Sequence, residues 1–247
     1  MIVVMPMAGR GSRFAGYPVS MPKPLIPVAG RPMFTWALRS LDGLAYSRVV
    51  FVVLAEHEAQ FGITRFAREA AGDTAEVVLL DDVTEGQLCS VLAARAYLDT
   101  DEAVLVASAD TYIRSNLAHD IARCESSCHG LISVADLPGD RWSFARTDEN
   151  GDVVEVAEKV RISDHASTGL YYFANSRHFV ATADAMIANK EKTRGEYYVI
   201  PVYQKYIDRD CRVGLSVAQA MWDMGTPEAL AAFEQHLAGG GAVILDL

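Results

Sequence analysis

The N-terminal segment places cationic side chains beside small residues, directly after an apolar run. Residues 2–5 are apolar, and a glycine-rich stretch with Arg13 follows at 8–14, with Lys23 shortly after it. Small residues let backbone N–H groups approach an anion closely, and arginine and lysine supply positive charge. The segment therefore predicts a phosphate-binding loop.

The spacing of this loop excludes two common phosphate sites. The dinucleotide fingerprint needs a third glycine where Phe14 stands, and the Gly-Lys-Ser/Thr of nucleoside triphosphatases is absent. A surface turn after a strand is the alternative for a lone glycine pair. Arg13 and Lys23 at this spacing favour the phosphate site.

The charge distribution points to a small anionic substrate. The chain of 247 residues has a formal net charge of −10, which argues against general nucleic-acid binding. The local charge is opposite, because Arg10, Arg13, Lys23 and Arg31 all precede the first acidic residue, Asp42.

The cysteine pattern indicates neither a metal site nor a disulfide framework. Cys124, Cys128 and His129 lack a second ligand pair, so free thiols are expected there, as at Cys89 and Cys211. No apolar run approaches the ~20 residues of a spanning helix. No signal-peptide pattern is present either, so we expect a cytoplasmic protein.

The elements that must position these residues alternate between strands and helices. Short Val-rich runs are typical of strands buried on both faces, and alternation with helices predicts βαβ units and a mainly parallel sheet. Ligands of such sheets bind beyond the carboxyl ends of strands, so the loops at 7–14 and 108–110 should converge. The expected strands are 2–5, 49–54, 77–80 and 104–107, and the expected helices are 33–41, 58–70 and 86–98.

The second half has a more antiparallel pattern. Asn150-Gly151 between two strand-like runs predicts a hairpin. We expect one domain, 1–247, whose apolar tail after Gly241 contacts another element or a second subunit of a homo-oligomer. The expected strands are 131–135, 143–147, 153–156, 170–173 and 242–247, and the expected helices are 177–189, 198–207 and 229–237.

Several motifs in this order resemble those of the sugar-phosphate nucleotidylyltransferases. The resemblance covers essentially the whole chain and is greatest to short bacterial members that serve cell-surface polysaccharide pathways. It implies a three-layer Rossmann-like fold, a mixed, mainly parallel sheet flanked by helices. The motifs are Gly11-Ser12-Arg13, Pro22-Lys23-Pro24, Ser108-Ala109-Asp110, Glu158-Lys159, Thr168-Gly169, Arg194-Gly195-Glu196 and Asp223-Met224-Gly225-Thr226-Pro227-Glu228.

The family reaction implied is transfer from an NTP to a sugar 1-phosphate, giving an NDP-sugar and pyrophosphate by Mg²⁺-dependent in-line attack on the α-phosphate. Phosphoryl-type transfer needs positioning and charge neutralisation, which suits these residue types. By resemblance, residues 1–125 mainly bind the NTP. Arg13 would neutralise the leaving pyrophosphate, Lys23 the α-phosphate, and Asp110 and Asp223 would hold Mg²⁺. Nucleotide contacts are assigned to Ala8, Gly9, Arg10, Gly11, Ser12, Gly86 and Gln87.

Residues 126–237 are expected to bind the sugar phosphate mainly, followed by a tail at 238–247. Lys159 would bind the phosphate and Glu158 a sugar hydroxyl, although Val160 stands where the family commonly has proline. Thr168 and Gly169 are the further substrate-binding candidates.

Other interpretations of these residues remain open at this point. Asp110 could cap a helix, Asp223 could serve a turn, and Thr84 could cap the helix that begins near Gly86. Other functions are a cytidylyltransferase acting on a non-sugar phosphate such as phosphocholine, and a non-catalytic nucleotide-sugar-binding protein. A glycosyltransferase needs an Asp-x-Asp motif, and Asp99-Thr100-Asp101 precedes a strand rather than following one.

Overall fold

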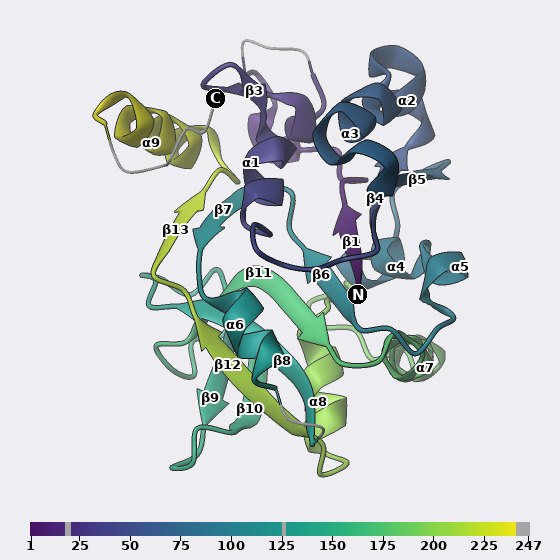
Figure 1. Cartoon of the computed structure of the whole chain (residues 1–247), viewed down its shortest axis with the longest axis vertical. Helices are drawn as coiled ribbons and strands as arrows, with labels where there is room; N and C mark the ends of the chain where they lie inside the picture. The colour runs from purple at the N-terminus through teal and green to yellow at the C-terminus, as the bar shows by residue number, and fades with distance from the viewer. Residues whose placement is uncertain (18–20, 125–126, 241–247) are drawn as a thin grey trace.

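The computed structural model describes residues 1–17, 21–124 and 127–240, and all structural statements refer to these. Within them, a nine-stranded mixed sheet forms the centre of the molecule (Figure 1). Its main path runs β10-β9-β11-β6-β1-β4-β5, and β8 joins β11 to β12. The strands are β1 (Ile2–Pro6), β4 (Arg48–Leu54), β5 (Ala75–Leu80), β6 (Val104–Ala107), β8 (Cys128–Ala135), β9 (Ser143–Thr147), β10 (Val153–Glu158), β11 (Ala166–Phe173) and β12 (Arg212–Val217).

Helices cover both faces of this sheet and make it the middle of three layers. The side chains of β1 alternate between two cores, with Val4 packing on one face and Val3 on the other. The first core includes α4 (Gln87–Leu92), α5 (Arg95–Leu98), α7 (Ser176–Ala188) and α8 (Pro201–Ile207), and the second includes α1 (Met33–Arg39), α3 (Ile63–Ala71) and α6 (Leu117–Ala122). The predicted three-layer α/β fold is confirmed.

The central strands follow the sequence prediction closely. β1 pairs in parallel with β4 and with β6, in the register Val3↔Val49 and Val3↔Leu105. All of β4 from Val49 onward is buried, so both faces of this strand need apolar side chains. This is why a run of valines, and not an alternating pattern, marks each of these strands in the sequence.

Two of the expected helices are divided. The helix expected at 58–70 forms α2 (Ala55–Phe61) and α3, because Gly62 adopts a left-handed φ of 64° and ends the first one. The Gly62 N–H donates to the Glu58 carbonyl at 2.8 Å, which closes that last turn. The helix expected at 86–98 likewise forms α4 and α5.

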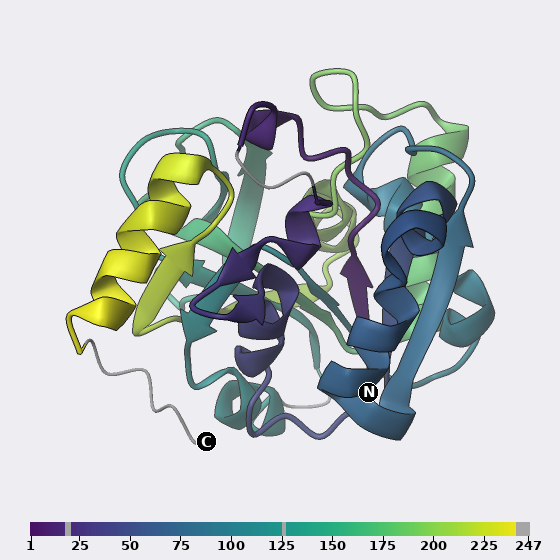
Figure 2. The same ribbon diagram turned by 90° about the horizontal axis from the view of Figure 1, so that it is seen from above.

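The second half contains the predicted hairpin and a ribbon that was not predicted. β9 and β10 are antiparallel, with Thr147 opposite Val153 around Asn150-Gly151. In the unexpected ribbon, β7 (Thr111–Arg114) pairs with β13 (Ala220–Asp223), so that Asp223 lies opposite Thr111. Figure 2 shows α9 (Pro227–Ala238) beside β13, across the molecule from α2. A short pair, β2 (Pro27–Val28) and β3 (Arg31–Pro32), completes the described strands.

The structure corrects the expectation for two of the cysteines. Cys124 follows α6 and Cys128 begins β8; their Cα atoms are 5.6 Å apart and the sulfurs form a disulfide. The bond joins the residue that follows shortly after α6 to the first residue of β8. Cys89 and Cys211 are free thiols, as expected.

Two further expectations concern the tail and the membrane. The strand expected at 242–247 lies outside the described residues. Among the residues that are described, no helix combines the length and hydropathy needed to cross a bilayer.

Candidate active site

A cleft of about 520 Å³ opens where the glycine-rich loop after β1 faces the segment after β6. The expected convergence of residues 7–14 and 108–110 is therefore confirmed. Parts of α4, the segment around Tyr198, and Gly225 complete the walls. Of the site residues expected from the sequence, the cleft is lined by Ala8, Gly9, Arg10, Gly11, Ser12, Arg13, Lys23, Gln87 and Asp110.

The glycine-rich loop is tight because Gly11 has the left-handed φ of 63°. A Cβ at this position would lie 3.0 Å from the Cβ of Lys23, so glycine also allows the close approach of the two segments. The Phe14 N–H donates to the Gly11 carbonyl at 2.8 Å, and the Lys23 Nζ lies 5.7 Å from the Phe14 ring centre. The turn thus places Lys23 at the loop.

Arg10 points to the rim of the cleft, where it bridges two other segments. Its guanidinium donates to Glu56 at 3.1 Å and to Asp82 at 2.8 Å. All these side chains are more than half exposed, so the contacts are exchangeable with solvent.

The two aspartates expected to hold a metal ion are brought together by the β7–β13 ribbon. Asp110 precedes β7 and Asp223 ends β13. A Cβ on Gly225 would lie 2.8 Å from Asp223 Oδ1 and 3.4 Å from Asp110 Oδ2, so both carboxylates lie against Gly225. Asp110 precedes a strand and caps no helix, which rules out the capping interpretation. Asp223 does serve a turn, because the Gly225 N–H donates to its Oδ1 at 2.8 Å.

Each of these carboxylates is in contact with a cation. Lys23 Nζ donates directly to Asp110 Oδ2. Burial alone would raise the pKa of Asp110, but Lys23, with Arg13, outweighs it and holds this pKa below its usual value. The Arg141 guanidinium donates to Asp223 Oδ2 at 2.7 Å.

These residues fit a magnesium ion that also binds substrate phosphates. Mg²⁺ is usually held by one or two carboxylates together with phosphate oxygens and water. Within the described part of the chain, no group of three or more His, Cys, Asp or Glu side chains is placed to hold a metal ion without additional ligands such as phosphate oxygens and water. The two carboxylates that lie against Gly225, with Asp110 in the same cleft as the glycine-rich loop, match the carboxylate part of that donor set.

The segment before α4 is joined to the segment around Tyr197. The Tyr197 N–H donates to the Glu85 carbonyl and the Leu88 N–H donates to the Tyr197 carbonyl, both at 3.0 Å. A Cβ on Gly86 would lie 2.4 Å from the Tyr197 carbonyl oxygen, so only glycine fits between them. Thr84 does not cap α4; its hydroxyl donates to the Gly86 carbonyl instead.

Glu158 and Lys159 lie at the end of β10, and they are not an ordinary solvated pair. The Glu158 side chain is only 5% exposed and accepts a hydrogen bond from Ser143 Oγ. Burial raises the pKa of Glu158, although Ser143 and Lys159 oppose the shift. Lys159 Nζ donates to the hydroxyl of Tyr198, whose side chain lines the cleft.

Sequence reasoning did not assign Arg194 or Arg141 to the site. Arg194 Nη2 donates to the Lys159 carbonyl at 2.9 Å, and Arg194 and Lys159 both have left-handed φ values, 51° and 55°. Strained backbone at neighbouring cations is typical of binding sites. The Arg194-Gly195-Glu196 motif was the available signal for Arg194, whereas nothing local in the sequence marks Arg141.

Thr168 and Gly169 are not among the residues that line this cleft, and neither are Gly86, Glu158, Lys159 and Asp223. Thr168 is 1% exposed and its hydroxyl donates to Ser133. Gly169 has a φ of 91°, and a Cβ there would lie 2.4 Å from Ser108 Oγ. Its carbonyl accepts from the Ser108 N–H at 3.0 Å. Gly169 therefore positions the segment that carries Asp110, because only glycine permits this approach.

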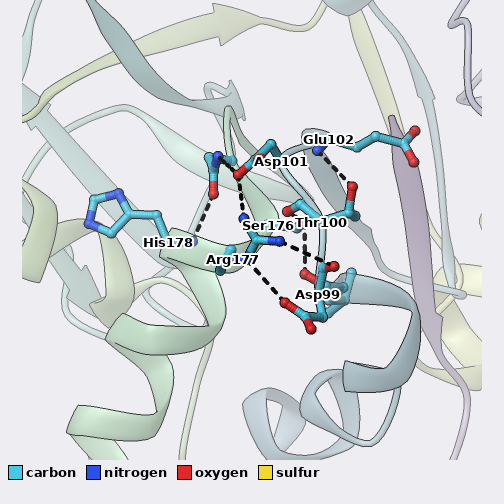
Figure 3. Close-up of polar contacts among 9 residues, drawn as sticks. Asp99, Thr100, Asp101, Glu102, Ser176, Arg177 and His178 are labelled. Atoms are coloured by element: carbon cyan, nitrogen blue, oxygen red, sulfur yellow. Dashed lines mark hydrogen bonds and ion pairs between the residues drawn. The ribbon is translucent and has the colours of Figure 1, made fainter.

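The Asp-x-Asp motif is engaged in an ion pair elsewhere. Figure 3 shows Arg177 between the two aspartates; its Nε donates to Asp99 at 3.0 Å and its Nη1 to Asp101 at 2.8 Å. The motif lies before β6, whereas the cleft opens after that strand. It ties α7 to the sheet, and the structure gives no support to a glycosyltransferase metal site.

The fold and the cleft define an α/β nucleotide-binding protein of the transferase type, and comparison with known proteins identifies the family. The nucleotidyl transferase family model matches residues 3–239, so the chain belongs to this family. The resemblance found in its motifs is thereby confirmed.

Individual relatives agree with this assignment. The chain is 32% identical to the bifunctional protein GlmU of Maricaulis maris, over 93% of this chain and 52% of GlmU. It spans about half the length of the curated relatives that it matches first. A local match of 40% identity relates 38% of the chain to 15% of the CMP-5'-(3-aminopropyl)phosphonate synthase of Streptomyces rubellomurinus.

A solved structure shows the same fold. The nucleoside-diphosphate-sugar pyrophosphorylase of Vibrio cholerae superimposes with a TM-score of 0.82 at 26% identity, over 95% of this chain and all of that one.

Proposed function

We propose that the protein transfers a nucleotidyl group from an NTP to a sugar 1-phosphate and releases pyrophosphate. One observation carries the proposal: Arg13, Lys23 and Asp110 come from separate segments and line one cleft beneath the glycine-rich loop. The similarity to an NDP-sugar pyrophosphorylase over nearly the whole chain supports a sugar phosphate as the acceptor.

The chemistry follows from the positions of the charges. An oxygen of the acceptor phosphate attacks the α-phosphorus in line, and the bond from this phosphorus to the oxygen bridging to the β-phosphate breaks. The backbone N–H groups of residues 9–12 hold the triphosphate. Lys23 stabilises the charge that builds on the α-phosphate, and Arg13 neutralises the leaving pyrophosphate. The attacking phosphate is already an anion at neutral pH, so no general base is required.

Asp110 and Asp223 would hold Mg²⁺ in this proposal. The ion would supply positive charge to the phosphates when bound. Gly225 is essential to the arrangement, because a side chain at this position would collide with Asp223 Oδ1 at 2.8 Å.

The acceptor is assigned to the region of Lys159. Lys159 and Arg194 offer two cations to its phosphate, and their contact through the Lys159 carbonyl keeps them adjacent. The Glu158 carboxylate would accept a hydrogen bond from a sugar hydroxyl, and Gly86 and Gln87 would contact the base. The sequence resemblance favours a cytoplasmic enzyme that makes activated sugars for cell-surface polysaccharides.

A cytidylyltransferase acting on a non-sugar phosphate or phosphonate is the second candidate. The local match to a CMP-phosphonate synthase favours it, because that protein's name specifies a cytidine nucleotide and no sugar. The two candidates share the nucleotide side of the cleft and differ in the acceptor.

The test is a panel of the four NTPs with several sugar 1-phosphates, phosphocholine and an alkylphosphonate, with Mg²⁺ present and pyrophosphate as the readout. Release with a sugar 1-phosphate supports the first candidate, and release only with phosphocholine or the phosphonate supports the second. Absence of pyrophosphate in every combination contradicts both and leaves a non-catalytic nucleotide-binding protein.

A further inference from the structure

The Arg141–Asp223 ion pair is a feature of the site that the proposed reaction does not use. Asp223 is one of two carboxylates assigned to a divalent cation, yet its Oδ2 already accepts a hydrogen bond from Arg141 Nη2 at 2.7 Å. Its other oxygen, Oδ1, accepts from the Gly225 N–H at 2.8 Å. A divalent cation that binds Oδ2 therefore meets a guanidinium on the same oxygen.

We propose that Arg141 is a positioning residue that competes with the divalent cation for Asp223. In the metal-free protein Arg141 neutralises and orients the Asp223 carboxylate; when the cation binds, Arg141 is displaced towards the acceptor. This inference rests on the proposed function for its metal site.

The surroundings of Arg141 allow this displacement. The Asp223 side chain is 16% exposed, whereas that of Arg141 is 49% exposed. The Arg141 guanidinium lies 4.3 Å from the ring centre of Trp142, so much of it rests on the indole and in solvent. Moving it breaks one ion pair, whose arginine is half exposed, and takes no buried side chain from its packing.

The loop that carries Arg141 leads directly to the acceptor residues. The Lys159 N–H donates to the Trp142 carbonyl at 2.9 Å, so the backbone beside Arg141 is fixed to the residue assigned to the acceptor phosphate. Arg161 holds the other side of this loop by donating to the carbonyls of Leu137 and Gly139. Because the backbone of this loop is held at both points, a displaced Arg141 side chain remains near Lys159 and adds a cation there.

The experiment is a Mn²⁺ titration of the full chain with a non-hydrolysable NTP analogue present, because phosphate oxygens complete the donor set. It is followed by the EPR signal of the free ion and compared with the analogue alone. An ion pair with a half-exposed arginine opposes metal binding only modestly. Arg141→Ala should therefore bind Mn²⁺ about two- to fivefold more tightly than the wild type. Arg141→Lys keeps the charge and should lie between the two. The matched control is Arg146→Ala, which removes an arginine of similar exposure, paired with Glu155 outside the cleft, and changes net charge equally.

The proposal is overturned if Arg141→Ala binds Mn²⁺ with unchanged or weaker affinity. It is also overturned if Arg146→Ala gains affinity by the same factor, or if the wild type binds no Mn²⁺. In steady-state kinetics the acceptor KM of Arg141→Ala should rise about two- to fivefold, with the NTP KM unchanged. An unchanged acceptor KM overturns the displacement towards the acceptor. Pyrophosphate release by the wild type is measured separately, so failure of the proposed function is distinguished from failure of the role of Arg141.

Discussion

Two lysine–carboxylate pairs have the same charges, but the pKa of the carboxylate is shifted in opposite directions. Lys23 contacts Asp110 directly, and the pKa of Asp110 is lowered. Lys159 Nζ lies 3.9 Å from Glu158 and donates to Tyr198 instead, and burial raises the pKa of Glu158. The difference lies in where each ammonium points, because a charge in direct contact outweighs desolvation and a more distant one does not.

This difference agrees with the different tasks that we propose for the two pairs. A carboxylate held as an anion beside a cation suits the charged phosphates and a metal ion. A buried carboxylate with one hydroxyl partner, Ser143, suits recognition of an uncharged group such as a sugar hydroxyl. Four substitutions test whether the two pairs divide the work in this way.

The largest effect is expected for Lys23→Ala. Loss of a cation that acts on the α-phosphate in the transition state should lower kcat by about 10²–10³-fold. Pyrophosphate release at saturating substrates measures it. Lys205→Ala, which removes an ion-paired lysine outside the cleft, is the control and should retain wild-type turnover. Unchanged turnover in Lys23→Ala would contradict the assignment.

A smaller and different effect is expected for Lys159→Ala. Loss of a charge-assisted contact to the acceptor phosphate should raise the acceptor KM by about tenfold or more and leave the NTP KM near that of the wild type. Steady-state kinetics with each substrate varied in turn separates the two constants. If Lys159→Ala instead lowered kcat as Lys23→Ala does, with both KM values retained, the two pairs would not differ in task.

The smallest effect concerns stability and its dependence on pH. The lowered pKa of Asp110 means that its charge stabilises the fold above pH 3.8, the ordinary aspartate value, and that this is lost as the pH falls through the folded-state pKa. The raised pKa of Glu158 means that its charge costs stability at neutral pH, and this cost disappears as the pH falls through the folded-state pKa towards 4.5.

Urea unfolding at pH 7 and pH 5 should therefore show opposite signs. Asp110→Asn should be less stable than the wild type at both pH values. Glu158→Gln should be more stable at pH 7, by a margin that shrinks at pH 5. A change in the free energy of unfolding in the same direction for both variants would contradict the difference between the two pairs.

Much of the fold was predictable because β1, β4 and β6 are buried on both faces, although β5 at the edge of the sheet is only partly buried. The Val-rich runs at β1, β4, β5 and β6 and the turn at Asn150-Gly151 are local signals, and all were confirmed. The break at Gly62 was missed because an isolated glycine inside a helical pattern is often tolerated. The disulfide was missed because it depends on the distance between Cys124 and Cys128 in space, which their spacing in the sequence does not set.

The sequence by itself determined the glycine-rich loop, the alternation of strands and helices, and the family, because glycine spacing, apolar runs and ordered motifs are written along the chain. Only the tertiary structure decided which charges meet. The β7–β13 ribbon brings Asp223 to Asp110, and Arg141 reaches Asp223 across 82 positions of sequence. It also buried Thr168 against Ser133, and it separated the pKa values of two similar acid–lysine pairs. Contacts and burial of this kind depend on distances between segments, and the sequence carries no local signal for them.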